Sequence, residues 1–118
     1  MNVREFYETI GSSYEEVFER LMKDDRIVKY LRKFALEDEY VRIEKYLDAN
    51  DAQEAFRCVH SVKGMCLNLG LSKLCTSSAV LCDELRNGII EGDISDKVKR
   101  FKDDYYYIVA KIKELDDC

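Results

Sequence analysis

Proline and tryptophan are absent from the sequence, and glycine occupies only five of its 118 positions. Because proline and glycine are the usual residues of turns and loops, their scarcity favours long uninterrupted helices. The sequence also lacks an apolar run of the roughly 20 residues needed to cross a bilayer. Its first ten residues, MNVREFYETI, do not show the pattern of a signal segment. We therefore expect an all-α cytoplasmic protein with no membrane partner.

Charge of one sign is not concentrated anywhere in the sequence. There are 19 Lys and Arg and 24 Asp and Glu, which give a net charge of −5, and the two signs are interspersed. Nucleic-acid binding asks for a clustered basic face, so we expect no nucleic-acid partner. A chain of this length is the size of one ordinary domain. We expect residues 1–118 to form one domain and the protein to be a monomer.

Cysteine pairs with the C-x-x-C spacing of zinc and redox sites are also missing. The sequence has five cysteines: Cys58, Cys66, Cys75, Cys82 and Cys118. The first four fall on the apolar sides of predicted helices, where a reduced cysteine acts as a small hydrophobic residue. We expect these four to be buried free thiols and Cys118, the last residue of the sequence, to be exposed.

Apolar residues recur at helical spacing along the first half of the chain. Two short helices are predicted within residues 2–22, the second opened by the capping-box sequence Ser13-Tyr14-Glu15-Glu16. A long helix is predicted from about Arg26 to Asp48, and it carries two apolar stripes. The stripes are Ile27, Leu31, Phe34 and Val41, and then Leu36, Tyr40, Ile43 and Leu47. Two stripes indicate that this helix is packed on two sides.

Three more helices are predicted in the second half. The first opens with a second capping-box sequence at residues 51–54 and ends near Leu69, where Gly70 is a helix stop. The next extends to about Ile90, and the last, over about 94–115, has a near-regular a/d seam. Four long amphipathic helices joined by short links predict an antiparallel up-down four-helix bundle over about 26–115. The N-terminal helices are expected to cover one side or end of it.

The only histidine of the chain, His60, lies in the segment VHSVKGMCLNLG at positions 59–70. A helix turns about 100° per residue, so a helical wheel gathers one set of residues into a core-facing stripe. This stripe consists of Ala55, Val59, Val62, Cys66 and Leu69. His60 falls on the opposite side, together with Phe56, Arg57, Lys63, Gly64 and Leu67. The imidazole is therefore predicted to point into solvent.

A surface histidine without a role would not explain the residues around it. Gly64 in mid-helix costs about 1 kcal/mol relative to alanine, and its missing side chain lets another backbone approach. Phe56 and Leu67 leave large apolar groups on the same face, as a docking surface would. The Lys63 ammonium suits a group that becomes negatively charged, and Arg57 could reach the same region. These neighbours favour a functional histidine.

The segment resembles the histidine-containing phosphotransfer (HPt) domain family of multistep phosphorelays. The resemblance rests on His60-x-x-Lys63-Gly64, followed by Asn68-Leu69-Gly70 and then Leu74, with Phe34 and Asp51 upstream. It extends from about Ser13 to Leu115. Departures are Val62 where leucine is commoner, and Cys66 and Leu67 where small residues are usual. Leu67 is therefore expected to affect which partner docks rather than the chemistry.

The resemblance implies a role for each matching residue. His60 would be the phosphoacceptor, Lys63 its electrostatic partner, and Gly64 the clearance for a docking protein. Receiver docking is expected to involve four further residues: Phe56, Arg57, Leu67 and Asn68. A neutral imidazole nitrogen would attack the phospho-aspartate of a receiver domain and later pass the phosphoryl group to a receiver aspartate.

The resemblance also implies the partners: response-regulator receiver domains and a hybrid sensor histidine kinase. A receiver would bring its own Mg²⁺, so no cofactor or metal is expected on this chain. The sequence has no P-loop or Gly-rich nucleotide lid. We therefore expect a free-standing phosphocarrier that is not an enzyme and does not phosphorylate itself from ATP.

Two other classes of protein are weighed against the phosphocarrier. An interaction module could bind receiver domains without carrying phosphate, but loss of the histidine would be its expected mark. A metal or redox bundle would need ligands that converge, whereas His60 and the core-facing Cys58 and Cys66 point apart. A single histidine also rules out the paired Glu-x-x-His motifs of di-iron bundles.

Overall fold

The computed structural model describes residues 1–116, which form helices and short links without any strand. The helices are α1 (Val3–Ile10), α2 (Tyr14–Leu21), α3 (Asp24–Glu37), α4 (Glu39–Asp48), α5 (Ala52–Leu69), α6 (Ser72–Leu85) and α7 (Ser95–Lys113). The all-α prediction is therefore confirmed. No helix within the described residues combines the length and the apolar composition that a bilayer crossing requires.

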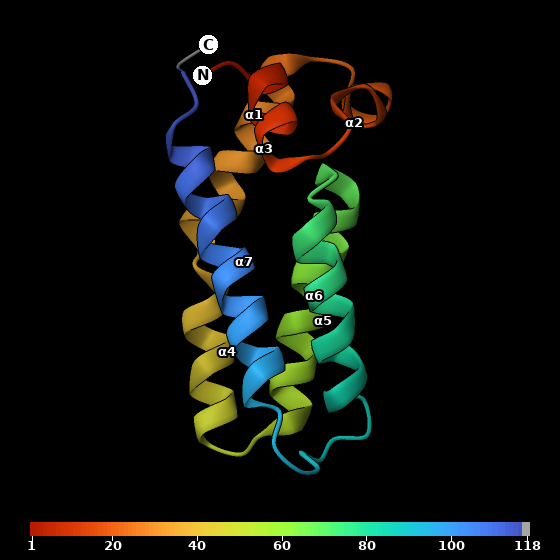
Figure 1. The fold of residues 1–118 in the computed structure, drawn as a ribbon, viewed down its shortest axis with the longest axis vertical. Coiled ribbons are helices and arrows are strands. Elements are labelled where there is room, and N and C mark those ends of the chain that lie inside the picture. The colour runs from red at the N-terminus through yellow and green to blue at the C-terminus, as the bar shows by residue number, and fades with distance from the viewer. Residues whose placement is uncertain (117–118) are drawn as a thin grey trace.

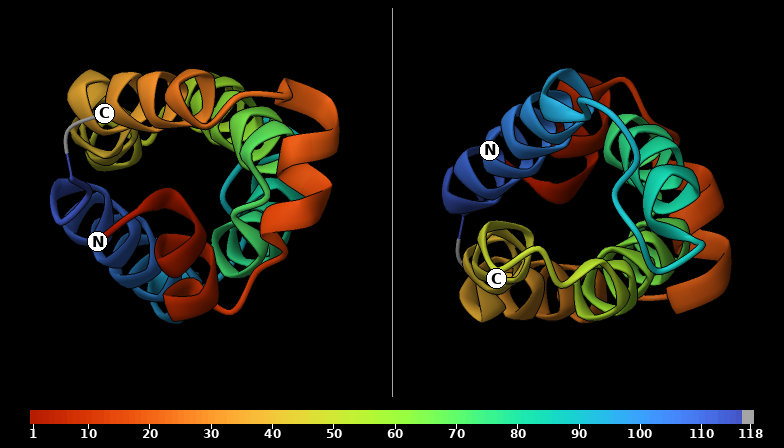
Figure 2. Two further views of the ribbon diagram at one scale, coloured as in Figure 1. Left: turned by 90° about the horizontal axis from the view of Figure 1, so that it is seen from above. Right: turned by 90° about the horizontal axis from the view of Figure 1, so that it is seen from below.

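The long helices lie side by side and alternate in direction (Figure 1). The chain descends through α3 and α4, returns along α5, descends again along α6 and ascends through α7. The two end views in Figure 2 show these helices around a common centre, with α1 and α2 at one end. The molecule is elongated, with extents of 43 × 21 × 19 Å.

The core runs the length of the molecule and draws on all seven helices. Its largest fully buried side chains include Phe6 and Tyr7 of α1, Phe34 of α3, and Phe101 and Tyr105 of α7. The Tyr7 hydroxyl donates a hydrogen bond of 2.6 Å to the carbonyl oxygen of Leu69. The N-terminal helices are thus attached to the end of α5 by a polar contact as well as by apolar packing.

The predicted long helix over 26–48 is wrong in one respect, because Asp38 divides it into α3 and α4. Asp38 has φ 45° and ψ 53°, the left-handed conformation that aspartate tolerates better than most residues. The Tyr105 hydroxyl accepts the N–H of Glu39 at 2.9 Å, which satisfies a donor at the start of α4. The break also changes the helical phase. Leu36 and Val41, both predicted to pack, are 85% and 57% exposed.

The helix α6 is shorter than predicted, ending at Leu85 rather than near Ile90. Gly88 has φ 76°, and its N–H donates to the carbonyl oxygen of Leu85 at 3.0 Å, which closes a turn. A left-handed residue cannot continue a helix, so Ile89 lies outside the core and is 55% exposed. At the other end of the bundle, α3 begins at Asp24, slightly before the predicted start.

The predicted limits of α5 agree with the structure. The Asp51 side chain accepts the Glu54 N–H at 3.2 Å, as an N-cap should. Gly70 follows the helix in the left-handed conformation, with φ 67°. A complete capping box, with both reciprocal hydrogen bonds, forms between Asn2 and Glu5 at the start of α1.

The cysteines within the described residues are free thiols, as predicted. Cys66 and Cys82 are buried, whereas Cys58 and Cys75 are half-buried. Burial raises the pKa of the Cys66 thiol, since a thiolate is disfavoured away from water. Cys118 lies outside the described residues.

Candidate functional site

The outward face of α5 carries the residues singled out from the sequence. The core stripe predicted from the helical wheel is buried: Ala55, Val59, Val62, Cys66 and Leu69. His60 lies on the opposite side and is exposed. None of the hydrogen bonds within residues 1–116 involves its imidazole, so both ring nitrogens are open to a reactant. The helical period alone was sufficient to predict this orientation.

Phe56 lies one turn before His60, and the two rings are in contact. Their centroids are 5.7 Å apart and their planes are inclined by 35°. Phe56 is half-buried and packs against the hydrophobic core. The exposed imidazole therefore lies against a ring that the core holds in place.

Lys63 lies one turn after His60 and is half-buried. Its ammonium forms no ion pair with any residue that the structure describes. Burial raises the pKa of the Cys82 thiol on α6, and the Lys63 charge partly opposes this effect. The Lys63 side chain thus lies on the α6 side of α5, and none of the described residues forms an ion pair with its ammonium group. Such a charge can pair with an incoming anion.

Gly64 is on the exposed side of α5, in the middle of the helix. A Cβ built at this position would meet nothing within 4 Å. The absence of a side chain is therefore not required by packing inside the protein. Gly70 differs, because a Cβ there would lie 2.5 Å from Cγ2 of Val17. The fold requires glycine at position 70 but not at position 64.

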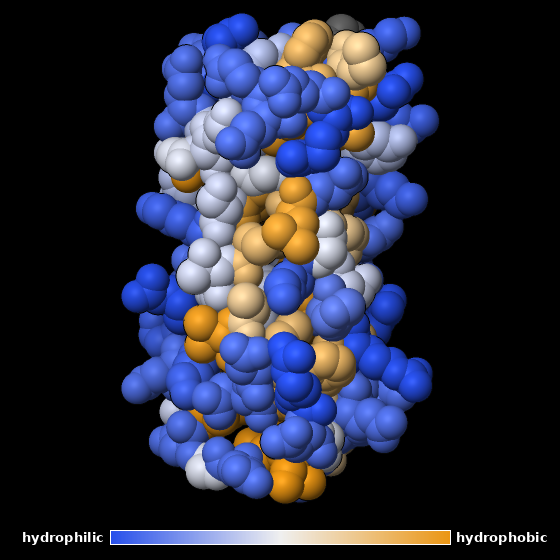
Figure 3. Space-filling view, turned by 90° about the vertical axis from the view of Figure 1, so that its right-hand side faces the viewer, coloured by the Kyte–Doolittle hydropathy of each residue, from blue (hydrophilic) through white to orange (hydrophobic). Residues whose placement is uncertain are grey.

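Arg57 is not brought to His60 by any described contact. Its Nη1 lies 3.4 Å from a carboxylate oxygen of Glu54, on the preceding turn of α5. Leu67 has the predicted exposure, with 59% of its surface accessible. Figure 3 views the side of the molecule where α5 and α6 lie, and shows apolar side chains gathered along the middle of this face between hydrophilic ones. Leu67 is seven residues after His60, two turns along the same exposed side of α5.

Asn68 is exposed at the edge of α5 that borders α3. It lines a groove of about 160 Å³ with Tyr30, Lys33 and Met65, among others. Pockets that bind small molecules usually have volumes of about 300–1,000 Å³, so this groove is too small for one. The α5 face is suited to contact with another macromolecule rather than to enclosure of a substrate.

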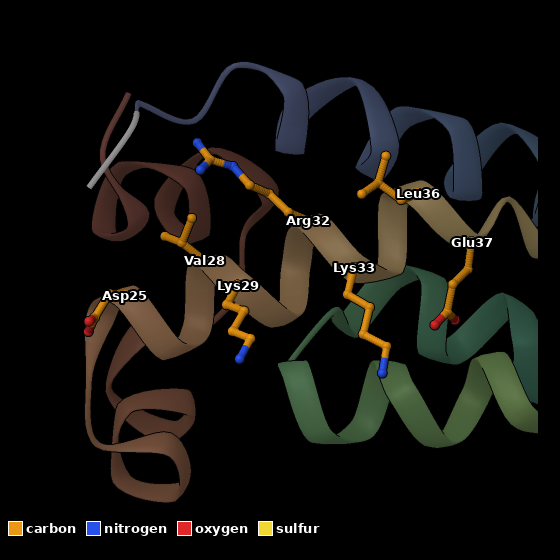
Figure 4. Close-up of a pocket in the computed structure, with 7 residues that line it drawn as sticks. All are labelled: Asp25, Val28, Lys29, Arg32, Lys33, Leu36 and Glu37. Carbon is orange, nitrogen blue, oxygen red and sulfur yellow. The ribbon is translucent and has the colours of Figure 1, made fainter.

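A larger shallow pocket lies along α3 (Figure 4). All of its lining residues belong to that helix: Asp25, Val28, Lys29, Arg32, Lys33, Leu36 and Glu37. The Arg32 side chain extends toward the C-terminal segment, where Nη2 donates to the carbonyl oxygens of Leu115 and Asp116 at 3.3 and 3.2 Å. No residue of α5 lines this pocket, so it is separate from His60.

Sequence reasoning missed the role of Arg20 on α2. Its guanidinium donates three hydrogen bonds of 3.0 to 3.2 Å to the carbonyl oxygens of Leu67 and Asn68. These oxygens belong to the last turn of α5, where helix carbonyls lack partners within the helix. Arg20 is 47 residues from Leu67 in sequence, so no local pattern could have revealed the contact.

A metal site in the described part of the chain would need a group of side chains that could hold the ion. Among residues 1–116, no three His, Cys, Asp or Glu side chains are grouped so that they could hold a metal ion. His60 is exposed whereas Cys66 on the same helix is buried, so the two side chains cannot coordinate the same metal ion.

The family model of the Hpt domain matches residues 33–110 of the chain. The match covers about two thirds of the sequence, and the chain belongs to the Hpt domain family. Hpt domains are phosphocarriers rather than classical enzymes: they take part in histidine phosphotransfer in phosphorelays and interact with receiver domains of response regulators and hybrid kinases. Comparison with curated proteins and with solved structures gave no match to this chain.

Proposed function

We propose that this chain is a histidine phosphotransfer protein with His60 as its phosphoacceptor. It would accept a phosphoryl group from the phospho-aspartate of one receiver domain and donate it to the aspartate of another. One observation carries the proposal: the only imidazole in an Hpt chain is exposed, and none of the described hydrogen bonds engages it. It also lies one turn before Lys63, which forms no ion pair with a described residue, and before Gly64, where a side chain would meet nothing within 4 Å.

The transfer is a displacement at phosphorus. A ring nitrogen of His60 forms the new N–P bond while the O–P bond of the acyl phosphate breaks, and the aspartate leaves as a carboxylate. The Lys63 ammonium would stabilise the negative charge of the phosphoryl group. A Mg²⁺ ion would be held by the receiver domain, and we expect none on this chain.

Docking must bring two proteins close enough for this displacement. Gly64 removes the side chain that would stand between the imidazole and the partner backbone. Leu67 lies one turn after this point and Arg57 two turns before it, and both are exposed on α5. Asn68, also one turn after Gly64, lies beside the groove with α3. We expect these three residues, with Phe56, to contact the receiver.

A chemical donor tests the proposal without needing a known partner. The protein is treated with phosphoramidate, and the phosphoryl group is located by mass spectrometry and tested for acid lability. We expect one acid-labile adduct on His60 of the wild-type protein and none on His60→Gln. An exposed residue outside the core changes stability by only about 0.5 kcal/mol, so the variant should fold normally.

A folded wild-type protein without an adduct would contradict the proposal. The chain would then be better described as an Hpt-like module that binds receiver domains without carrying phosphate. Adduct formation on His60→Gln at the wild-type level would contradict the assignment of His60.

A further inference from the structure

The orientation of the His60 imidazole has a physical cause within α5. Cα–Cβ bonds in a helix tilt toward its N-terminus, so a side chain leans over the turn that precedes it. For His60 that turn contains Phe56, four residues earlier. The ring centroids lie 5.7 Å apart, within the usual range for an aromatic pair, and the planes are tilted by 35°.

The two rings differ in their freedom to move. Phe56 is half-buried and packs against the core, whereas His60 is exposed. The His60 imidazole forms no hydrogen bond with any residue that the structure describes. Arg57, on the same turn, is paired with Glu54. An exposed imidazole would ordinarily sample several rotamers. Here one rotamer places it against an anchored aromatic surface.

We propose that Phe56 is a positioning residue for phosphoryl uptake, holding the His60 imidazole in one orientation and covering one face of its ring. The inference rests on the proposed function of His60. It assigns Phe56 a role inside the site in addition to its expected contact with the receiver domain. A nucleophile held in its reactive orientation has less entropy to lose on the way to the transition state.

A small donor separates this role from docking, since phosphoramidate has no protein surface to recognise. In that reaction the imidazole forms an N–P bond as the P–N bond of the donor breaks. The imidazole gives up its N–H proton, and the leaving group departs as ammonium. The rate at saturating donor therefore reports on the imidazole itself.

We expect Phe56→Ala to lower the saturating rate about 2- to 10-fold, the range that follows from the strength of an aromatic pair. The donor concentration for half-maximal rate should not change. Phe56→Tyr, which keeps the ring, should restore the rate to within about twofold. Phe56→Leu keeps apolar bulk in the core without the ring, and should remain slow even if the alanine variant folds poorly.

Nuclear magnetic resonance supplies an independent signature, because the chain has one histidine. The ring current of Phe56 should shift the carbon-bound protons of His60, and this shift should vanish in Phe56→Leu and persist in Phe56→Tyr. Phe18→Ala is the matched control: Phe18 is 40% exposed on α2, where its ring contacts Tyr14. It should change neither the shift nor the rate.

An unchanged phosphoramidate rate in Phe56→Ala or Phe56→Leu would overturn the inference, even if transfer from a receiver became slower. Phe56 would then be a docking contact and the proposed function would stand. If the wild-type protein took up no phosphoryl group, the proposed function would fail first and the inference with it.

Discussion

At the scale of single residues, glycine at position 64 lowers the stability of α5 but leaves space for a partner protein to approach His60. Glycine in mid-helix costs about 1 kcal/mol relative to alanine, and no atom within 4 Å would oppose a Cβ at this position. We expect Gly64→Ala to raise the free energy of unfolding by about 1 kcal/mol in urea denaturation.

The same position should be sensitive when a partner docks. Gly64→Gln places a long side chain beside the imidazole and should slow uptake from a receiver domain more than uptake from phosphoramidate. Equal losses with both donors would mean that Gly64 acts on the imidazole itself and not on docking.

Lys63 should act on the charge of the phosphoryl group. Its ammonium forms no ion pair with the described residues, and the structure places it one turn from His60. We expect Lys63→Ala to slow phosphoryl transfer or to shorten the lifetime of the phosphohistidine, measured by the decay of the adduct. The control is Lys29→Ala, an exposed lysine on α3. A rate and a lifetime equal to those of the wild type would leave Lys63 without a part in the chemistry.

The residues of the site could be predicted from sequence because their directions follow from one regular helix. The helical period separates the buried Val59 and Val62 from the exposed His60 without any tertiary information. The engagement of Arg57 by Glu54 and the position of Asn68 at the edge that borders α3 depend on side-chain partners. The helical period of the sequence does not specify such side-chain partners.

At the scale of elements, the corner between α5 and α6 holds the N-terminal helices in place. Gly70 has φ 67°, and a Cβ at this position would lie 2.5 Å from Cγ2 of Val17 on α2. Two penalties therefore add in Gly70→Ala: about 1–2 kcal/mol for the left-handed conformation and about 1–3 kcal/mol for overpacking.

Gly88→Ala is the matched control for this prediction. Gly88 has φ 76°, but a Cβ there would meet nothing within 4 Å. Thermal or urea unfolding should show a larger loss of stability for Gly70→Ala than for Gly88→Ala. The difference between the two measures the overpacking against Val17. Equal losses would show that α2 shifts to accommodate the added methyl group without lowering the free energy of unfolding.

The break between α3 and α4 shows where sequence reasoning about elements ends. Residues 26–48 contain no proline or glycine, so nothing in the local pattern marks a stop. The break depends on Asp38 in the left-handed conformation and on the Tyr105 hydroxyl, 66 residues away from Glu39 in sequence. A helix can be predicted from its own residues, but a break stabilised by another helix cannot.

At the scale of the whole molecule, the Hpt match and the fold do not have the same limits. The match begins at residue 33, so α1, α2 and the first part of α3 precede it. These segments nevertheless contribute Phe6 and Tyr7 to the core, and Arg20 satisfies the carbonyls that end α5. The helix that carries His60 thus depends at its C-terminal end on residues outside the matched region.

The core also determines how the whole fold responds to alkali. Burial raises the pKa of Tyr40 and of Tyr105 to about 12, from an ordinary value of 10.0. It also raises the pKa of the Cys66 thiol above its ordinary 9.0. The folded protein therefore keeps these protons at pH values where the unfolded chain has released them.

The sign of the effect follows from proton linkage. Wherever the unfolded state binds fewer protons than the folded state, the free energy of unfolding falls as pH rises. The stabilisation is complete below about pH 9, where both states are protonated, and is lost as pH rises through about 12. We expect the midpoint of urea unfolding to fall over this interval. Absorbance of tyrosinate near 295 nm should rise at the unfolding transition. A midpoint that stayed constant to pH 12 would mean that these groups titrate freely in the folded protein.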